Sequence, residues 1–302
     1  MGYTYEQKKI HGKDGTEITG FDGSARFLTI PEEIDGLPVL SIGSHAFSGR
    51  KELEEIRLPE SVTKIGNFCF YDCSSLEELV LTGAVDDLGD GAIRECGALR
   101  NIDVTTDDHA FRVVKELMED NPNELCFTIH VKSEEGRITD YRLVIPAWHH
   151  EDREDTHARA IHPKIAGAGY AYRQTVTRTE LNIREYDSLF EKAQADGVHP
   201  SAKIALWRLA CPAGLSEDAR GKYVTWLDAH AGEVLQDLVA GPRAAESRDL
   251  LAVLLNNVKL PEDAVDSASD LAGKEGKTEL CSMLMEYRNT HFEKPSAEIF
   301  EL

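Results

Sequence analysis

The sequence predicts an α+β protein with a repetitive β-solenoid in its N-terminal third, a short β-hairpin connecting segment, and a C-terminal all-α array of helical pairs. Three observations support this prediction. Matched positions recur every 23 residues near the N-terminus, two segments of alternating apolar residues follow, and from Ile183 onward apolar residues recur three and four positions apart. The predicted domains are residues 1–110, 111–182 and 183–302.

Composition limits the classes of function that the chain can serve. Of its 302 residues, 41% are hydrophobic and 29% are charged, which is typical of a folded soluble protein. A net charge of −21 argues against binding to nucleic acid or anionic lipid, because both require a positive field. No apolar run is long enough to cross a bilayer, and no apolar signal-peptide core follows the first charges. We therefore expect a cytoplasmic protein, with the cell surface as the alternative if an export signal is missing from this sequence.

The 23-residue repeat holds position by position over successive coils. A unit of this length cannot bury an apolar face alone, so the fixed period indicates a solenoid in which each coil packs on the next. Period-2 alternation predicts strands at residues 53–58 and 62–65, followed by one turn that places Phe68 or Phe70 in the interior. The matched positions are Leu53, Leu76 and Leu99; Ile56, Leu79 and Ile102; Leu58, Leu81 and Val104; Gly43, Gly66 and Gly89; and Phe47, Phe70 and Ile93.

Residues 1–26 are predicted to form an opening cap. Within it we expect a short strand at residues 17–21, with turns at residues 14–15 and 22–23. The first full coil matches the second only after five extra residues, IDGLP at positions 34–38, are set aside. Insertions of this kind are expected in the loops of a solenoid.

The repeat phrases IPEEIDGLPVLSIGSHAF, LPESVTKIGNFCFYDCSSLEEL and CGALRNIDV resemble the BspA-type leucine-rich repeat family over roughly residues 16–105. The resemblance implies a right-handed β-solenoid with strands in stacked parallel ladders. It also implies a binding role, since the family's tasks are mostly binding, often at bacterial or protist cell surfaces. The family offers no catalytic motif to carry over to this chain.

The repeat array weakens in its third coil and stops at Val104. A helix is predicted at residues 111–119, and alternating strands at residues 124–131 and 138–145 predict a β-hairpin. Because the open end of a solenoid exposes an unpaired ladder, we expect the hairpin to pair with that end or to cover it.

Several polar residues between the hairpin and the helices are candidates for a site. The segment WHHEDREDTHARAIH is rich in His, Asp and Glu, the side chains that bind metal ions. A metal-binding site and a solvent-facing linker both explain this composition, and the linker explains it more simply. Gly167 and Gly169 make a G-x-G without the third glycine of a nucleotide loop, so a tight turn that lets Tyr170 and Tyr172 pack inward is favoured. The candidate metal ligands are His149, His150, Glu151, Asp152, Asp155, His157 and His162, and Arg173 and Arg178 are candidates for a small-ligand or peptide contact.

Helical spacing predicts helices at residues 185–196, 200–211, 216–230, 232–240, 244–257, 261–273 and 277–289. Ser216 is a good N-cap, and Trp207, Trp226 and Leu227 are predicted core anchors. Residues 260–287 resemble the helical half of an ankyrin repeat, without its T-P-L-H phrase. The helical region as a whole, roughly residues 186–289, is therefore an ankyrin-like or HEAT-like array, after which Ile299 or Phe300 could dock the tail.

The six cysteines form no zinc-binding pattern, and Cys73 and Cys96 share a repeat position, which favours stacked buried thiols over a disulfide. Cys126 and His130 lie on one face of a predicted strand, which we attribute to chance. No hydrolase, nucleotide or zinc-protease motif is present. We therefore predict a non-enzymatic scaffold that binds a protein and needs no cofactor. We assign no catalytic, metal-binding or cofactor-binding residues. The alternatives are a cell-surface adhesin or carbohydrate-binding protein, and a hydrolase with its site at the domain junction near residues 148–162.

Overall fold

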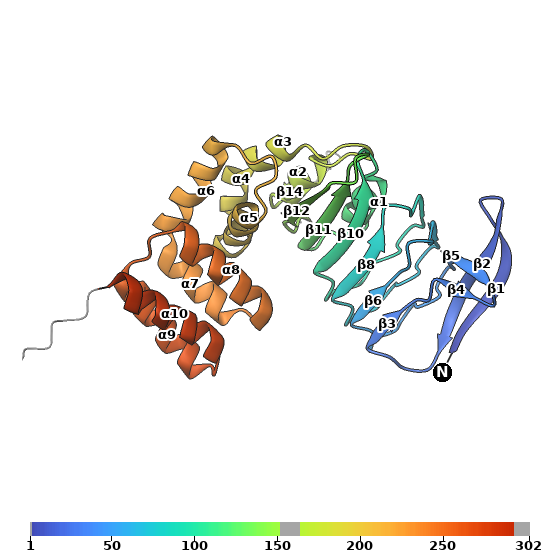
Figure 1. Cartoon of the computed structure of the whole chain (residues 1–302), viewed down its shortest axis with the longest axis horizontal. Coiled ribbons are helices and arrows are strands. Elements are labelled where there is room, and N and C mark those ends of the chain that lie inside the picture. Colours follow the sequence, from blue (N-terminus) through green and yellow to red (C-terminus); the bar gives the residue numbers. More distant parts are fainter. Residues whose placement is uncertain (1, 152–163, 293–302) are drawn as a thin grey trace, which may run out of the picture. The chain divides into compact units, whose positions relative to one another are not determined.

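The structure is a computed structural model that describes residues 2–151 and 164–292 (Figure 1). The chain divides into two compact units, Met1–Ala195 and Asp196–Leu302. A β-solenoid fills most of the first unit and helices form the second, which confirms the predicted fold class. The division into three domains at residues 110 and 182 stays a prediction.

Two sheets run along the solenoid, because each coil adds one strand to each of them. Strands from successive coils pair in parallel, as stacked repeats require. Sheet A contains, in spatial order, β1 (Gly2–Ile10), β2 (Lys13–Asp22), β5 (Leu37–Ile42), β7 (Lys64–Ile65) and β9 (Asp87–Leu88), with β4 (Glu33–Ile34) beside β5. Sheet B contains β12 (Ile138–Ile145), β11 (Leu125–Lys132), β10 (Asn101–Asp107), β8 (Glu78–Thr82), β6 (Glu55–Arg57) and β3 (Phe27–Thr29).

The predicted apolar columns form the core between these sheets. Ile56 pairs directly with Leu79, and Leu79 with Ile102, so a column follows from the strand register. Phe70 lies in the interior, where its ring stacks on Phe47 with centroids 5.7 Å apart, whereas Phe68 is only half-buried. Leu53, Leu76 and Leu99 are all fully buried. The prediction of stacked coils is therefore confirmed.

The repeated glycine that follows each sheet A strand allows the coils to approach closely. A Cβ atom on Gly66 would lie 2.4 Å from the backbone nitrogen of Ser44, and one on Gly89 would lie 2.3 Å from that of Asn67. Real side chains do not tolerate such distances to a backbone atom. The glycine column seen in the sequence is thus a steric requirement of coil stacking.

The turns that follow these glycines form a third ladder, here called the turn edge. In each coil, backbone N–H groups donate to carbonyl groups of the next coil, as His45 does to Asn67 at 3.0 Å. The equivalent donors of the third coil, Gly91 and Ile93, have no further coil. Their N–H groups donate instead to the two carboxylate oxygens of Asp120, at 3.0 and 2.8 Å. One side chain therefore ends the ladder.

Asp120 comes from the end of α1 (Arg112–Asp120), the helix predicted at residues 111–119. Burial raises the pKa of its carboxyl group, although the N–H donors of Ile93 and Gly91 and the charge of Arg94 favour the ionised form. The electrostatic cost of placing a carboxylate here is offset by satisfying two backbone donors that would otherwise be buried without partners.

The opening cap differs from the prediction. Instead of one short strand at residues 17–21, β1 and β2 form a long antiparallel hairpin that turns at His11 and Gly12, where φ is 49° and 80°. The turn predicted at residues 14–15 is wrong, because both residues lie inside β2 opposite Lys9 and Lys8. The polar, exposed character of β1 hid its strand pattern. The five-residue insertion forms the turn of the β4–β5 hairpin, as expected of a loop.

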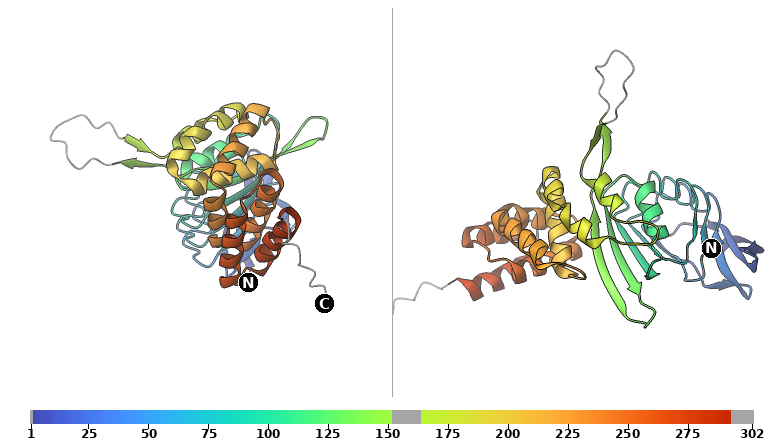
Figure 2. Two further views of the ribbon diagram at one scale, coloured as in Figure 1. Left: turned by 90° about the vertical axis from the view of Figure 1, so that its left-hand side faces the viewer. Right: turned by 90° about the horizontal axis from the view of Figure 1, so that it is seen from above.

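The predicted hairpin at residues 124–145 extends the solenoid. β11 pairs in parallel with β10, and β12 then pairs antiparallel with β11, so both strands join sheet B. Both views of Figure 2 show the tip of this hairpin projecting from the solenoid. The edge of β12 is closed by the Tyr186 hydroxyl, which accepts from the Val144 N–H at 3.0 Å and donates to the Val144 carbonyl at 2.8 Å.

A buried arginine joins the elements around this end of the solenoid. Arg173, from α2 (Gly169–Gln174), is 2% exposed. Its guanidinium donates five hydrogen bonds, all to backbone carbonyl oxygens, and burial lowers its pKa to about 10. The acceptors are the carbonyl groups of Met118, Asn121, Asn123, Pro146 and Gly169.

The helices occur close to where periodicity places them, apart from residues 185–196, which form two short helices and a 3₁₀ turn, Gln194–Asp196. Ser216 caps its helix by accepting from the Ala219 N–H at 3.2 Å. The helices are α3 (Ile183–Ser188), α4 (Phe190–Ala193), α5 (Val198–Ala210), α6 (Glu217–Ala229), α7 (Ala231–Ala240), α8 (Ala244–Asn257), α9 (Glu262–Lys274) and α10 (Thr278–His291). A C-terminal region made of successive helices is consistent with the predicted ankyrin-like array.

Candidate functional site

The outward side chains of sheet B form the candidate site, here called the sheet B face. Alternate residues of each strand point into the core, as the burial of every second residue in β8 and β11 shows. The others form three rows across the stacked strands. The first row holds Phe27, Glu55, Glu78, Asn101 and Cys126; the second holds Thr29, Arg57, Val80, Asp103, Thr128 and Arg142; the third holds Thr82, Thr105, His130 and Asp140.

Charged groups of both signs occur on this face, and their signs alternate along the second row, from Arg57 through Asp103 to Arg142. Arg57 donates to Glu55 on its own strand and to Glu78 on the next strand, the second contact at 3.2 Å. His130 lies between two aspartates, with Nδ1 2.7 Å from Asp140 and Nε2 3.5 Å from Asp103. The face thus offers fixed donors and acceptors along its whole length, which suits recognition of a polar, patterned surface.

Aromatic side chains are sparse on this face. Among the described residues of the three rows, Phe27 is the one aromatic ring apart from His130, and it lies at the corner formed by the edge strand β3. Phe27 is 62% exposed, and the Arg26 guanidinium lies 5.4 Å from its centroid. Arg26 also donates two hydrogen bonds to Glu54, at 2.6 and 2.7 Å, and lowers the pKa of that carboxyl group.

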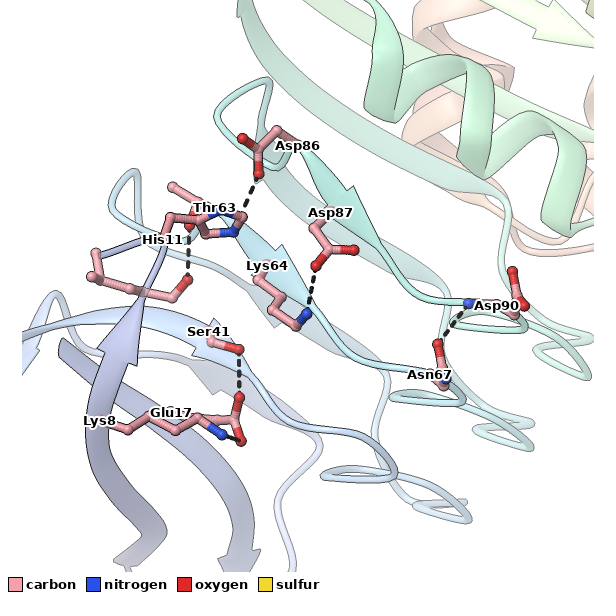
Figure 3. Close-up of polar contacts among 11 residues, drawn as sticks. Lys8, His11, Glu17, Ser41, Thr63, Lys64, Asn67, Asp86, Asp87 and Asp90 are labelled. Carbon is pink, nitrogen blue, oxygen red and sulfur yellow. Dashed lines mark hydrogen bonds and ion pairs between the residues drawn. The ribbon is translucent and has the colours of Figure 1, made fainter. Parts of the chain in front are cut away.

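The outward face of sheet A carries a shorter row of polar side chains, and its charges, like those of the sheet B face, pair with one another (Figure 3). The strand register aligns Glu17, Ser41, Lys64 and Asp87 in one row. Ser41 donates to Glu17 at 2.8 Å, and Lys64 pairs with Asp87 at 2.5 Å. Nearby, the ring of His11 lies 3.7 Å from the Asp86 carboxylate. This row links neighbouring coils and leaves fewer charges for a partner.

The histidine-rich stretch gives no metal site in the part of the chain that is described. His149 lies at the start of β13 (His149–Glu151), which pairs with β14 (Lys164–Ala166). Candidate ligands Asp152, Asp155, His157 and His162 lie outside the described residues, as do Ile299 and Phe300 of the tail. Across residues 2–151 and 164–292, no group of three His, Cys, Asp or Glu side chains is arranged to hold a metal ion.

The G-x-G segment is a turn followed by α2. Gly167 has a φ of 89°, and Tyr172 is fully buried with its ring edge against Tyr186, as expected. Tyr170, in contrast, is 43% exposed, so the prediction that it packs inward is wrong. Arg173 has every N–H group engaged by backbone carbonyls and cannot contact a ligand.

Arg178 is exposed and pairs with Glu116 at 3.4 Å. Glu116 also accepts from Arg112 at 2.9 Å, so this cluster is a surface ion-pair network. The candidate contact between Arg178 and a small ligand stays a prediction.

Cys73 and Cys96 are buried free thiols, as predicted. Cys73 and Cys96 stack on neighbouring coils, and each thiol donates to a carbonyl of the preceding coil, Phe47 at 3.1 Å and Phe70 at 3.0 Å. Burial raises the pKa of Cys73 to about 11 and that of Cys96 to about 12. Cys126 and His130 share a face of β11, but four residues of strand separate them by about 13 Å, too far to act together.

In the helical unit, Trp207 and Leu227 are buried core residues, as predicted. Trp226 is half-buried, and its ring stacks on His230 with centroids 4.3 Å apart, so it covers the edge of the core. None of the helices in the described part of the chain has the length and apolar content that a bilayer crossing requires.

Comparison with family models identifies the repeats. Residues 24–117 match the model described as BspA type Leucine rich repeat region (6 copies). Residues 24–117 are a BspA-type leucine-rich repeat region. The stacked coils, from β3 to β10, lie within this match, and the resemblance expected from the sequence is confirmed. A search of curated proteins gave no match to the chain.

Several solved structures are similar to part of the chain. A leucine rich cell surface protein from Faecalibacterium prausnitzii is 25% identical, over 37% of this chain and 33% of that one, with a TM-score of 0.30. The T. pallidum Leucine Rich Repeat protein is 20% identical, over 44% and 80% of the two chains, with a TM-score of 0.25. A leucine-rich repeat protein from Bacteroides ovatus is 20% identical, over 35% and 48%, with a TM-score of 0.22. The match spans about a third of the F. prausnitzii protein's length.

The sequence left the binding residues unknown, yet it contains a signal for them. Once the 23-residue register is known, the outward positions of each coil follow from the alternation, as with Glu55, Glu78 and Asn101. The extension of this face onto β11 and β12 required the pairing of β10 with β11, which no repeat encodes.

Proposed function

We propose that this chain is a non-catalytic scaffold that binds another protein through the sheet B face. The observation that carries the proposal is the continuous set of in-register rows across six strands, with donors and acceptors of both charges at fixed spacing. Leucine-rich repeats supply extended surfaces of this kind, which recognise macromolecules by surface substitution rather than by chemistry in a cleft.

The pattern of side chains favours a protein over a carbohydrate partner. Sugar-binding surfaces present aromatic rings for stacking, whereas this face carries its one exposed phenylalanine, Phe27, at a corner of the described rows. Alternating carboxylates, guanidinium groups and hydroxyl groups match the mixed polar surface of a protein. The adhesin role, the cytoplasmic location and the absence of nucleic-acid binding stay predictions.

The hydrolase alternative places its site near residues 148–162. The sequence contains no hydrolase motif that supports it. The alternative keeps its own test, a screen of general hydrolase substrates with wild-type protein and with His150→Ala and His157→Ala variants.

The test compares two threonine-to-arginine variants on outward strand positions. Thr128 lies in the second of the three rows, on β11, which is the strand next to the edge strand β12, and Thr19 is exposed on β2 of sheet A. Proteins captured from a lysate of the source cell by the full-length wild-type chain are identified and quantified by mass spectrometry. Each is then titrated against all three purified chains.

A partner that uses the sheet B face should bind Thr128→Arg at least tenfold more weakly, about 1.4 kcal/mol, because the long cation displaces contacts to the second row around β11. The same partner should bind Thr19→Arg as it binds the wild type. Equal binding of a captured partner to all three chains would place its contact outside the sheet B face and overturn the proposal.

A further inference from the structure

A cleft of about 190 Å³ opens beside the third row of the sheet B face, at the carboxyl ends of its strands. Thr82, at the end of β8, and Thr105, in β10, belong to that row and also line the cleft. Lys132 lines it from the end of β11. A partner bound to the face therefore reaches the cleft without a break in the surface.

The floor of the cleft is held rigidly. Gly83 follows β8, and its N–H donates to the Thr105 carbonyl at 2.8 Å. A Cβ atom on Gly83 would lie 2.0 Å from the Thr106 hydroxyl oxygen, which is buried and donates to the Ala110 carbonyl at 2.6 Å. No side chain fits at Gly83, so the open space is built into the backbone.

Three charged side chains line the cleft: Glu60, Asp107 and Lys132. Among the described residues, none of the three takes part in an ion pair or a side-chain hydrogen bond. This contrasts with the outward row of sheet A, where Lys64 and Asp87 neutralise each other. The cleft thus offers two carboxylates and one ammonium group to a ligand.

The excess of negative charge in the cleft indicates that the ligand is positively charged. Two carboxylates outweigh one ammonium group locally, and the chain as a whole carries a charge of −21, which attracts cations from a distance. Ala84 and Ala110 add small apolar contacts along the cleft. A flexible apolar stem that ends in a cation matches this combination.

We infer, on the basis of the proposed function, that the cleft receives a lysine or arginine side chain of the protein partner. The cationic head lies between the carboxylates of Glu60 and Asp107, and its stem passes the threonine and alanine side chains. Lys132 opposes this ligand and limits the cleft to a single cation, so its removal should strengthen binding.

The probes are Nα-acetyl-lysine amide and Nα-acetyl-arginine amide, titrated into the ¹⁵N-labelled full chain and followed by NMR at the backbone amides of Gly83 and Thr105. Nα-acetyl-glutamate amide is the probe of opposite charge. We expect saturable shifts with the two cationic probes and none with the acidic probe. Glu60→Gln and Asp107→Asn should each weaken binding about fivefold, and Lys132→Met should tighten it about twofold.

Glu6→Gln, an exposed carboxylate of β1 outside the cleft, is the matched control and should bind the probes as the wild type does. Weaker binding to Lys132→Met, or shifts caused by the acidic probe, would overturn the inference. Tighter binding of free lysine than of its blocked amide would also overturn it, because the ligand would then be an amino acid and not a protein side chain.

Failure of this inference is distinguishable from failure of the proposed function. If the probes bind the wild type, Glu60→Gln and Asp107→Asn equally while Thr128→Arg still loses a captured partner, the cleft inference alone is overturned. If Thr128→Arg binds every captured partner as the wild type does, the proposed use of the face is wrong.

Discussion

The two sheets of the solenoid have the same repeat and the same strand spacing, yet their outward faces differ in chemistry. On sheet A, Lys64 and Asp87 of neighbouring coils satisfy each other, and Ser41 donates to Glu17. On sheet B, polar side chains spread over six strands and two of its threonines border a cleft lined by charged side chains. Ion pairs such as Arg57–Glu78 also link coils on sheet B, so the two faces differ in extent and in the cleft. The difference teaches that the same repeat can present a longer polar surface on one face than on the other.

Stability and binding should therefore respond to different substitutions. Changes between the coils or along sheet A should alter the free energy of unfolding without altering partner affinity. Changes on the sheet B face, such as Thr128→Arg, should alter affinity and leave stability close to that of the wild type, since surface substitutions usually fall within about 0.5 kcal/mol.

Gly66→Ala is expected to have the largest effect on stability. The new Cβ would lie 2.4 Å from the Ser44 backbone nitrogen, so the first two coils must separate, at a cost of about 2 kcal/mol. Urea unfolding measures this cost. Gly97→Ala is the control, because no atom lies within 4 Å of the position that its Cβ would occupy, and its cost should stay below about 0.5 kcal/mol. Equal urea-unfolding midpoints for the two variants would show that close stacking of the coils does not require the glycine column.

Asp120→Ala is expected to have the second largest effect, a loss of about 1 to 2 kcal/mol in the free energy of unfolding, because the N–H groups of Gly91 and Ile93 lose their acceptors. Hydrogen exchange at these two amides should accelerate more than exchange in the interior coils. Asp120→Asn keeps one acceptor oxygen and should lie between the wild type and the alanine variant. Unchanged exchange at Gly91 and Ile93 in Asp120→Ala would contradict the assignment of Asp120 as the end of the ladder.

The Lys64–Asp87 ion pair of sheet A should make the smallest contribution to the free energy of unfolding. Both side chains are about 40% exposed, so solvent screens their attraction. A double-mutant cycle with Lys64→Met and Asp87→Asn should give a coupling energy below about 1 kcal/mol, with partner binding unchanged in all variants. A loss of partner binding in either single variant would show that sheet A also takes part in recognition.

The repeat made the solenoid predictable, and local signals placed most of the remaining elements. The columns of Leu53 and Ile56, the helix before Asn121, and the strands at residues 138–145 all follow from spacing and composition. β1 was missed because a polar edge strand has no buried face to produce alternation. Arg173 was misjudged because a buried arginine that is satisfied by carbonyl groups looks in sequence like any surface arginine.

The candidate site was harder to predict than the fold. Outward positions such as Asp103 follow from the alternation, but the contact of His130 with two aspartates depends on how three strands align. The cleft depends on Gly83, whose significance comes from Thr106 on the next coil. Sequence patterns describe which residues share a face, whereas sites also require the register between strands far apart in the chain.

The carboxylate of Asp120 recognises main-chain N–H groups, which every coil possesses, and not the side chains of one particular coil. A solenoid closed in this manner can change length without redesign of its end. In-frame duplication of residues 53–75 would add one more unit between the existing boundaries and widen the recognition surface by one strand. Gain and loss of whole units is then a simple evolutionary route by which such a protein adjusts to a larger or smaller partner.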